Sequence, residues 1–397
     1  MCPSTRRRTW KGERKLNNVF LKDMAYRKAR VILTTIGITV LIALILMLGG
    51  IMNGMRIQAQ QYPTFTGANI WISAEGSGSA FIGFSLLVPE HLAYLDGAQP
   101  LKPNSVSPLV FAHARPVIRG KLGKAVVVGY KADKLGGPTQ FELTEGRLVT
   151  ASQYEGWAEA DIPPREVVVD EKMNLEIGER ILIGNKDLKV VGKAKSLMFV
   201  LDTPLLFMDL RTAQEVLLKN SLHVNMMIAQ AADGYTPEKA AKELENFDEQ
   251  LKTIDVRTLK QTLRDIIATY VDEPMKAVQF LRVMLWIAAG LIVGMITYVT
   301  TLEKTQEIGV LKAIGASNFY ISSLIIKQVV IMSVVGVIGG LILSYIFAVA
   351  APIFVSIHPV ESGVVALISF VVCCAGGYLA ARKAIGVDPM VAFRGEV

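Results

Sequence analysis

Side chains that could do chemistry are few and scattered in this sequence of 397 residues. The histidines His91, His113, His223 and His358 are isolated, and each suits local hydrogen bonding better than metal ligation. No Gly-rich loop ending in Gly-Lys-Ser or Gly-Lys-Thr occurs, so the chain lacks the usual cradle for ATP phosphates. His-Glu-x-x-His, Gly-x-Ser-x-Gly and paired Cys-x-x-Cys motifs are also missing. The sequence therefore predicts no catalytic site, no metal site and no cofactor bound by this chain.

The three cysteines favour packing over redox chemistry. They are Cys2 and the adjacent pair Cys373 and Cys374, which lies inside an apolar run. Adjacent side chains on a helix point in different directions, so this pair is poorly placed to share a metal or a disulfide.

One polar stretch, TTLEKTQEIGVLKAIGAS at 300–317, lies between two long apolar runs. Ile308, Leu311 and Ile314 recur every three residues, which predicts a short amphipathic helix with these side chains on or near one face. Gly315 favours a sharp end to that helix, and Ser317 favours an N-cap for the next one. The apolar face could dock into a groove of a partner protein. The alternative is a helix that lies flat among lipid headgroups.

Composition indicates a membrane part and a water-facing part. The chain is 51% hydrophobic and 19% charged, with a mean hydropathy of +0.39. Ten basic and two acidic residues fall within 6–30, whereas the rest of the chain holds 32 basic and 33 acidic residues. The net charge of +7 is therefore a topology signal from the N-terminal tail, and we expect no nucleic-acid partner.

Four apolar runs are long enough to cross a bilayer, which takes about 20 helical residues. We expect membrane helices at 31–54, 276–302, 319–355 and 363–381. The first run is too long for a signal peptide and is followed by no small-residue cleavage site, so we expect a retained anchor.

The short flanks predict the orientation. The tail at 1–30 is strongly basic, and the tail at 382–397 carries Arg382, Lys383 and Arg394. The predicted link at 356–362 has no Lys or Arg. Counting of positive charges therefore places both termini in the cytoplasm and this link outside.

That orientation predicts the compartments of the two remaining segments. The large segment at 55–275 is expected to be extracytoplasmic, and the loop at 303–318 cytoplasmic. We therefore expect a multi-pass protein of the inner, or cytoplasmic, cell membrane.

The large segment between the first two spans mixes strand and helix signals. Val127 centres a β-rich run, residues 167–169 are all valine, and ILIGNKDLKVVG predicts a hairpin with its apex at Gly184–Asn185. Thr236 is an expected N-cap, with Pro237 at the first helical position. The predicted fold class is membrane α+β: four transmembrane helices with a large extracytoplasmic α+β domain inserted between helices 1 and 2.

The chain resembles the MacB/FtsX-type ABC transporter permeases in four segments, in the family's order. TLEKTQEIGVLKAIGASNFYI is similar to the cytoplasmic loop between spans two and three, and KARVILTTIGITVLIAL to the entry into span one. VVVDEKMNLEIGERILIGNKDLKVVGKAKS resembles part of the exported core domain, and ARKAIGVDPMVAFRGE the closing segment.

The resemblance implies a mechanism and partners. Such permeases work as homodimers or heterodimers with a separate ABC ATPase, which binds ATP and Mg; closure of the ATPase moves a coupling helix and, through it, the exported domains. A periplasmic adaptor is a further expected partner where an outer membrane exists. By analogy, the residues that contact or shape the contact with the ATPase are Glu303, Glu307, Ile308, Gly309, Leu311, Lys312 and Gly315.

Three further features concern packing and the bilayer. Gly336 and Gly340 form a small-x-x-x-small pair that suits close helix packing, within the chain or across a dimer. Arg282 is expected to extend toward the headgroups from the outer end of span two. The stretch 16–30 resembles the family's interfacial helix, with its Lys and Arg facing anionic lipid.

The predicted function is a permease subunit, not an enzyme in itself, that exports or extracts a hydrophobic or amphiphilic substrate. Met47, Met52 and Met55 are one hint of haem, which would be substrate and not cofactor, although methionine there also suits plain packing. Two alternatives remain: a mechanotransmitting permease that regulates an envelope hydrolase or sensor, and a membrane-anchored binding protein without an ATPase.

Overall fold

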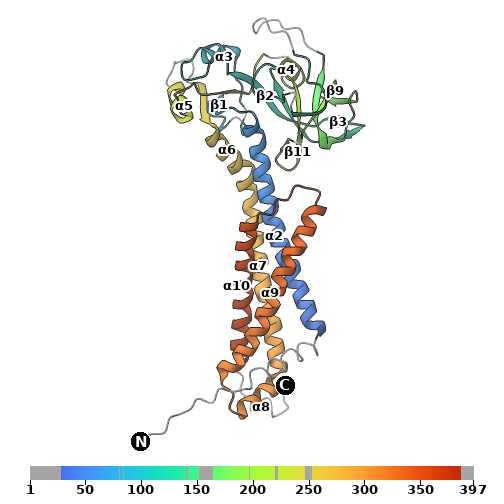
Figure 1. The fold of residues 1–397 in the computed structure, drawn as a ribbon, viewed down its shortest axis with the longest axis vertical. Coiled ribbons are helices and arrows are strands. Elements are labelled where there is room, and N and C mark those ends of the chain that lie inside the picture. The colour runs from blue at the N-terminus through green and yellow to red at the C-terminus, as the bar shows by residue number, and fades with distance from the viewer. Residues whose placement is uncertain are drawn as a thin grey trace. The chain divides into compact units, whose positions relative to one another are not determined.

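The computed structural model describes residues 28–79, 81–83, 85–139, 142–151, 164–195, 197–219, 222–245 and 253–385. The chain divides into two compact units (Figure 1). The helical unit comprises the described residues up to Asn53 and from Ala277, and the inserted unit is Gly54–Lys276. The predicted interfacial helix at 16–30 lies almost entirely outside the described residues, and so does the closing segment after residue 385.

Four long helices of the described chain are apolar enough to cross a membrane. They are α2 (Lys28–Phe65), α7 (Glu273–Glu303), α9 (Asn318–Ala350) and α10 (Pro359–Ile385). The inserted unit has limits next to the predicted 55 and 275, and it includes the last part of α2 and the first residues of α7.

The connection between α9 and α10 differs from the predicted one. We expected helix to continue to residue 355 and the link to be 356–362, but α9 ends at Ala350 and α10 starts at Pro359. Ala351 is extended, with ψ of 140°, because the residue before Pro352 avoids the helical region. Pro359 opens the next helix since its ring presets φ and its missing N–H is no loss in a first turn.

The interior of the helical unit is built from small and β-branched side chains. Its buried cluster contains residues from all four long helices: Ile38, Ile42, Ile45, Leu46, Ala289, Val293, Val329, Val365 and Cys373. Cys373 is fully buried in this cluster, as expected for a packing residue.

The inserted unit is built on one large sheet, with strand order β13-β1-β12-β2-β5-β11-β7-β9-β8-β3-β4 in its described part. Most pairs are antiparallel, but β5 with β11 and β7 with β9 are parallel. The strands are β1 Ile70–Ala74, β2 Ser107–Ala114, β3 Val117–Ile118, β4 Lys121–Leu122, β5 Ala125–Tyr130, β6 Leu143–Gly146, β7 Glu166–Asp170, β8 Arg180–Ile183, β9 Lys186–Ala194, β10 Met198–Phe199, β11 Thr203–Asp209, β12 Met226–Ala229 and β13 Ile254–Thr258.

The predicted hairpin is confirmed. Strands β8 and β9 are antiparallel, and Ile183 pairs with Lys186 next to the turn. Gly184 and Asn185 form the turn and have φ of 54° and 65°. Positive φ at both central residues is the turn that matches the twist of paired strands. The three valines at 167–169 lie in β7 and Val127 lies in β5, also as predicted.

The inserted unit contains several short helices, and side chains cap some of them. They are α3 Pro89–Asp96, α4 Leu210–Leu217, α5 Pro237–Glu245 and α6 Leu259–Ile267, with a 3-10 turn at Glu171–Met173 and a π-helix, η4, at Ala268–Asp272. At α5, the Lys239 amide donates to the Thr236 hydroxyl at 3.3 Å, which confirms the predicted cap. Thr258 and Gln261 form a capping box at α6.

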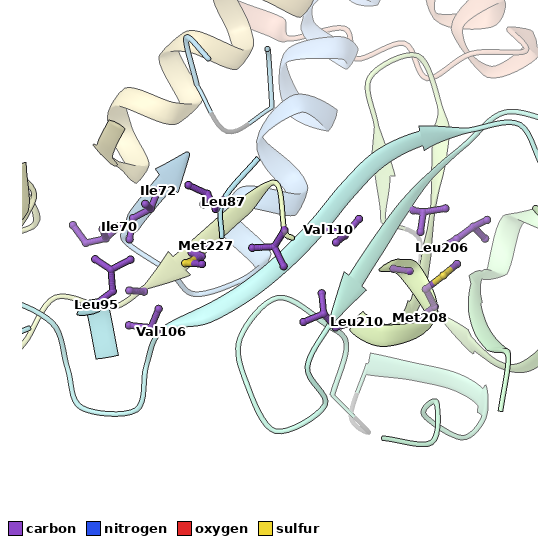
Figure 2. Close-up of a cluster of buried hydrophobic side chains, with 14 of the residues drawn as sticks. Ile70, Ile72, Leu87, Leu95, Val106, Val110, Leu206, Met208, Leu210 and Met227 are labelled. Carbon is purple, nitrogen blue, oxygen red and sulfur yellow. The ribbon is translucent and has the colours of Figure 1, made fainter. Parts of the chain in front are cut away.

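One aliphatic core joins the sheet to these helices (Figure 2). It includes Ile70 and Ile72 of β1, Val110 of β2, Leu206 of β11 and Leu210 of α4, all buried. The burial of this core makes the inserted unit a folded α+β domain, as the sequence predicted.

Candidate functional site

The predicted amphipathic helix is present as α8, Thr305–Ala313, directly after α7. Only Lys304 separates the two helices, and its carbonyl accepts from the Ile308 amide at 2.8 Å. Glu303 is the last residue of α7 and not part of α8. The helix is therefore shorter than the predicted 303–318 segment.

Both ends of the α8 segment are fixed by the residues that the sequence singled out. Gly315 has φ of +96°, the Gly315 amide donates to the Lys312 carbonyl, and the Ala316 amide donates to the Leu311 carbonyl, each at 2.9 Å. This pair of bonds is the Schellman motif, which closes a helix and turns the chain sharply. Ser317 then caps α9, because its hydroxyl accepts from the Tyr320 amide at 3.2 Å.

The exposed apolar surface of this segment is partly different from the predicted one. Ile308 and Leu311 are half-buried. Val310, Ile314 and Phe319 are instead exposed by 50%, 77% and 85%. We call these three residues the coupling surface. Phe319 was missed because it begins a long apolar run and was therefore assigned to the membrane span.

The other predicted coupling residues lie around this surface. Glu307 and Gly315 are exposed, Lys312 is half-buried and Gly309 is buried. Lys312 interacts with a neighbouring group, as does Glu303 at the end of α7.

Glycines set the helix contacts of the helical unit. A Cβ built on Gly336 would lie 2.7 Å from Cγ2 of Ile38, and one on Gly340 would lie 2.7 Å from Cγ2 of Ile42. These two glycines of α9 therefore pack against α2 of the same chain.

A second close contact was missed from the sequence. A Cβ on Gly376 of α10 would lie 2.3 Å from the carbonyl oxygen of Gly290 on α7. Gly290 and Gly294 have the spacing of a small-x-x-x-small pair, which could have identified the contact.

The inserted unit binds the end of α2 through an aromatic cluster. Tyr62 is fully buried, and its hydroxyl donates to the Gly136 carbonyl at 3.0 Å. Its ring centroid lies 5.6 Å from that of Phe111 on β2 and 6.3 Å from that of Phe207 on β11. Phe111 in turn meets Phe199 edge-on at 5.4 Å. This cluster links α2 to the middle of the sheet.

Two glutamines of α2 hold the hairpin of β10 and β11. Gln58 hydrogen-bonds both the backbone amide and the carboxylate of Asp202, and the side-chain oxygen of Gln61 accepts from the Met198 amide at 3.2 Å. The hairpin turn is strained, since Leu201 and Asp202 have φ of 60° and 52° without being glycine. Hydrogen bonds from the buried Gln58 offset that strain.

The π-helix η4 contacts both the aromatic cluster and α2. The Tyr270 hydroxyl donates to the Phe81 carbonyl at 2.7 Å, and its ring lies 5.3 Å from that of Phe199. Asp272 pairs with Arg56 of α2 at 2.9 Å. Single-turn π-helices are frequent at functional sites. We call η4, Arg56–Phe65 and the rings between them the joint.

Several charged groups in the described part of the inserted unit form ion pairs. Hydrogen bonds from Arg165, aided by Lys186, lower the pKa of Glu215 to about 2. Burial raises the pKa of Asp170, although its carboxylate accepts from the amides of Lys172 and Leu197. In the described part of the chain, no three His, Cys, Asp or Glu side chains are grouped as metal ligands would be. Met52 and Met55 are buried, as packing residues are.

A four-helix membrane part with an α+β domain between its first two helices and a short exposed helix between the second and third defines a permease of the ABC transporter class. Residues 31–247 match the model of the MacB-like periplasmic core domain, and residues 280–389 match that of the FtsX-like permease C-terminal domain. The chain belongs to the MacB/FtsX-type ABC transporter permease family. Membership implies a partner ATPase.

Relatives agree with this assignment. An uncharacterized ABC transporter permease of Mycobacterium tuberculosis is 25% identical over 381 residues, covering 94% of this chain and 98% of the relative. The macrolide export ATP-binding/permease protein MacB of Acinetobacter baylyi is 24% identical over 403 residues, covering 95% of this chain and 59% of MacB.

Two solved structures are similar to about half of this chain at low identity. The periplasmic region of MacB from Actinobacillus actinomycetemcomitans matches with a TM-score of 0.37 and 14% identity, covering 52% of this chain and 94% of that structure. The extracellular domain of the transporter YknZ matches with a TM-score of 0.33 and 11% identity, covering 48% and 99%.

Proposed function

We propose that this chain is the membrane subunit that converts ATP hydrolysis by a separate ATPase into movement of the inserted unit, and that this movement exports or extracts a hydrophobic or amphiphilic substrate. ATP and Mg bind to the ATPase, and haem is relevant only as a substrate. The chain acts as a homodimer or with a second permease, and a periplasmic adaptor joins it where an outer membrane exists.

The proposed orientation puts α8 and both termini in the cytoplasm and the inserted unit outside. It rests on the ten basic residues within 6–30 and on Arg382 and Lys383 in the last turn of α10. The connection at 351–358 contains no Lys or Arg. The membrane is the inner, or cytoplasmic, membrane of the cell.

The observation that carries the proposal is the coupling surface. Val310, Ile314 and Phe319 present exposed apolar side chains on a segment closed by a Schellman motif and a Ser317 cap. Exposed apolar groups held on a rigid element are typical of a helix that fits a groove in a partner. In a permease of this family, that partner is the ATPase.

The joint supports the transmission step of the proposal. Helix α2 contributes residues to both units, and its last turns are held by Tyr62, Gln58 and Arg56 in the inserted unit. Displacement of α2 along or across its axis therefore acts on the hairpin of β10 and β11 and on the rings around Phe111. Packed elements transmit such displacements because their interiors resist compression.

Co-purification tests this proposal. The tagged full-length chain is isolated from its native membranes in mild detergent, and the bound fraction is assayed for ATP hydrolysis and for a polypeptide with a P-loop. We expect wild type and Leu122→Glu, a control at another exposed apolar residue, to retain the ATPase. Ile314→Glu with Val310→Glu should lose it, and Glu307→Lys should weaken it. An ATPase retained equally by all variants contradicts the role of the coupling surface, and its absence from wild type contradicts the proposed function.

A further inference from the structure

A small pocket with polar groups at an apolar lining lies in the helical unit beside the connection between α9 and α10. Its lining includes Gly49, Gly50 and Asn53 of α2, Arg282 of α7, and His358 and Glu361. The Ser356 amide donates to the Gly50 carbonyl at 2.9 Å, and a Cβ on Gly50 would lie 2.6 Å from Cγ1 of Val355. The glycines therefore let the connection lie directly on α2. We call this site the end pocket.

Arg282 lines the end pocket at the end of α7 that the sequence places near the headgroups. A Cβ on Gly49 would lie only 3.3 Å from its Nη2, and its guanidinium lies 5.8 Å from the centroid of the Trp286 ring. Its buried Nε has no acceptor, and no carboxylate of the described residues lies within 4.0 Å of its nitrogens. The guanidinium is thus held in place with hydrogen-bond donors unused.

Glu361 brings the opposite charge to the same pocket. Its carboxylate accepts from the side-chain amide of Asn53, which fixes it at the first turn of α10. It does not form a salt bridge with Arg282, although both line the pocket. Arg282 is half-buried and Glu361 is exposed, so water weakens the attraction between them. Held apart, they are complementary to a ligand that carries both charges.

We propose that the end pocket binds the headgroup of a zwitterionic membrane lipid, with its phosphate on Arg282 and its primary ammonium on Glu361. The planar guanidinium suits a phosphate group, since it offers two parallel donors. An ammonium supplies N–H donors to the carboxylate, which a choline group cannot do. Trp286, whose indole N–H donates to the Ser369 hydroxyl at 3.0 Å, is the kind of ring found at headgroup level.

Trp286 also provides a local reporter for the test. The full-length chain is reconstituted in phosphatidylcholine bilayers that contain a fixed fraction of lipid with brominated acyl chains, whose headgroup is ethanolamine, choline or glycerol. The Trp286→Phe variant is measured in parallel, so that the difference isolates quenching at Trp286. We expect phosphatidylethanolamine to be preferred over phosphatidylcholine about tenfold, the size expected for a hydrogen bond to a charged group.

Variants test which residue binds the phosphate of the headgroup and which binds the ammonium. Glu361→Gln should abolish the preference for ethanolamine over choline, and Arg282→Gln should reduce quenching by all three lipids to that of bulk lipid. Arg282→Lys, which keeps the charge, should retain part of the binding and guards against loss of folding. Lys276→Gln is the matched control, because Lys276 is an exposed cation of α7 paired with Glu273.

Three results would overturn the proposal. Equal quenching by the three lipids would mean that Arg282 only contacts the headgroup layer. Strongest quenching by phosphatidylglycerol, unchanged in Glu361→Gln, would mean a site for anions. Displacement by soluble phosphoethanolamine as effective as displacement by the lipid would mean a site for a free solute. The proposal does not depend on the ATPase, so failure of the proposed function leaves this test unaffected.

Discussion

The two units of this protein both bury aliphatic side chains but differ in where their largest apolar residues lie. In the inserted unit, Trp71 and Phe207 are about 1% exposed, and the largest apolar residues are inside. In the helical unit the interior contact is made by Gly290 and Gly376, while Leu291 and Val349 are 67% and 91% exposed. The helical unit therefore leaves many large apolar side chains on its surface, although its interior is also aliphatic.

The difference reflects the solvent of each unit. Water drives large apolar side chains into the sheet core, because exposing them costs about 25 cal/mol per Å². Lipid tails exert no such drive, so helices associate through close contacts that only small residues permit. The comparison teaches that a glycine in α10 has a packing role, as a phenylalanine in β2 does.

The largest expected effect comes from the aromatic cluster. Phe111→Ala removes a ring that contacts Tyr62, Phe81 and Phe199, and should lower the free energy of unfolding by about 3–5 kcal/mol. Urea unfolding followed by near-UV circular dichroism measures this change. Leu122→Ala, at an exposed position, is the control and should change stability little. Equal losses in both variants would contradict the assignment of the cluster.

The glycine contact between α7 and α10 should rank next. Gly376→Leu places side-chain atoms against the Gly290 backbone, which cannot move aside, and should cost about 1–3 kcal/mol or more. Thermal melting and size-exclusion profiles in detergent report the loss. Gly37→Leu is the matched control, since a Cβ there has nothing within 4 Å. If both variants melt alike, close packing is not what holds the helices.

Acid should weaken the inserted unit through Glu215. Hydrogen bonds from Arg165 lower its folded-state pKa from 4.5 to about 2, so the stabilisation is complete above pH 4.5 and is lost as the pH falls toward 2. Because Arg165 and Lys186 are about 40% exposed, we expect about 1–2 kcal/mol.

Unfolding at a series of pH values tests this expectation. Glu215→Gln should be less stable than wild type at pH 6 and approach it at pH 2.5. Glu145→Gln, which removes a carboxylate from an exposed pair, serves as the control. A difference between wild type and Glu215→Gln that is constant with pH would contradict the assignment.

The smallest expected effect is a gain. Leu201 has φ of 60° and is 57% exposed at the turn between β10 and β11. Leu201→Asn should raise the melting temperature, because asparagine tolerates this conformation better, by about 0.5–1 kcal/mol of stability. Leu122→Asn, at another exposed leucine, should bring no gain. A loss of stability in Leu201→Asn would mean that the Leu201 side chain makes a contact that outweighs the strain.

Local features were predictable from the sequence and distant contacts were not. The turn at Gly184–Asn185, the Thr236 cap and the Gly315 helix end depend on a few adjacent residues, and each was found. Tyr62 and Phe207 meet although 145 positions separate them, and no periodicity in one sequence reveals such a pair. The exposure of Phe319 could not be predicted for a related reason. The sequence of an apolar run does not show whether its first residue lies inside the bilayer or outside it.

The most direct test of the central claim is a distance measurement within one chain during ATP turnover. Spin labels at Leu122 in the inserted unit and Val360 in the helical unit, both exposed, are introduced after replacement of the three native cysteines. Pulsed electron resonance then compares the complex with its ATPase in the nucleotide-free state and with ATP and vanadate. We predict that the distance distribution shifts in wild type and stays fixed in Ile314→Glu. An unchanged distribution in wild type, with an active ATPase bound, would contradict the claim that α8 drives the inserted unit.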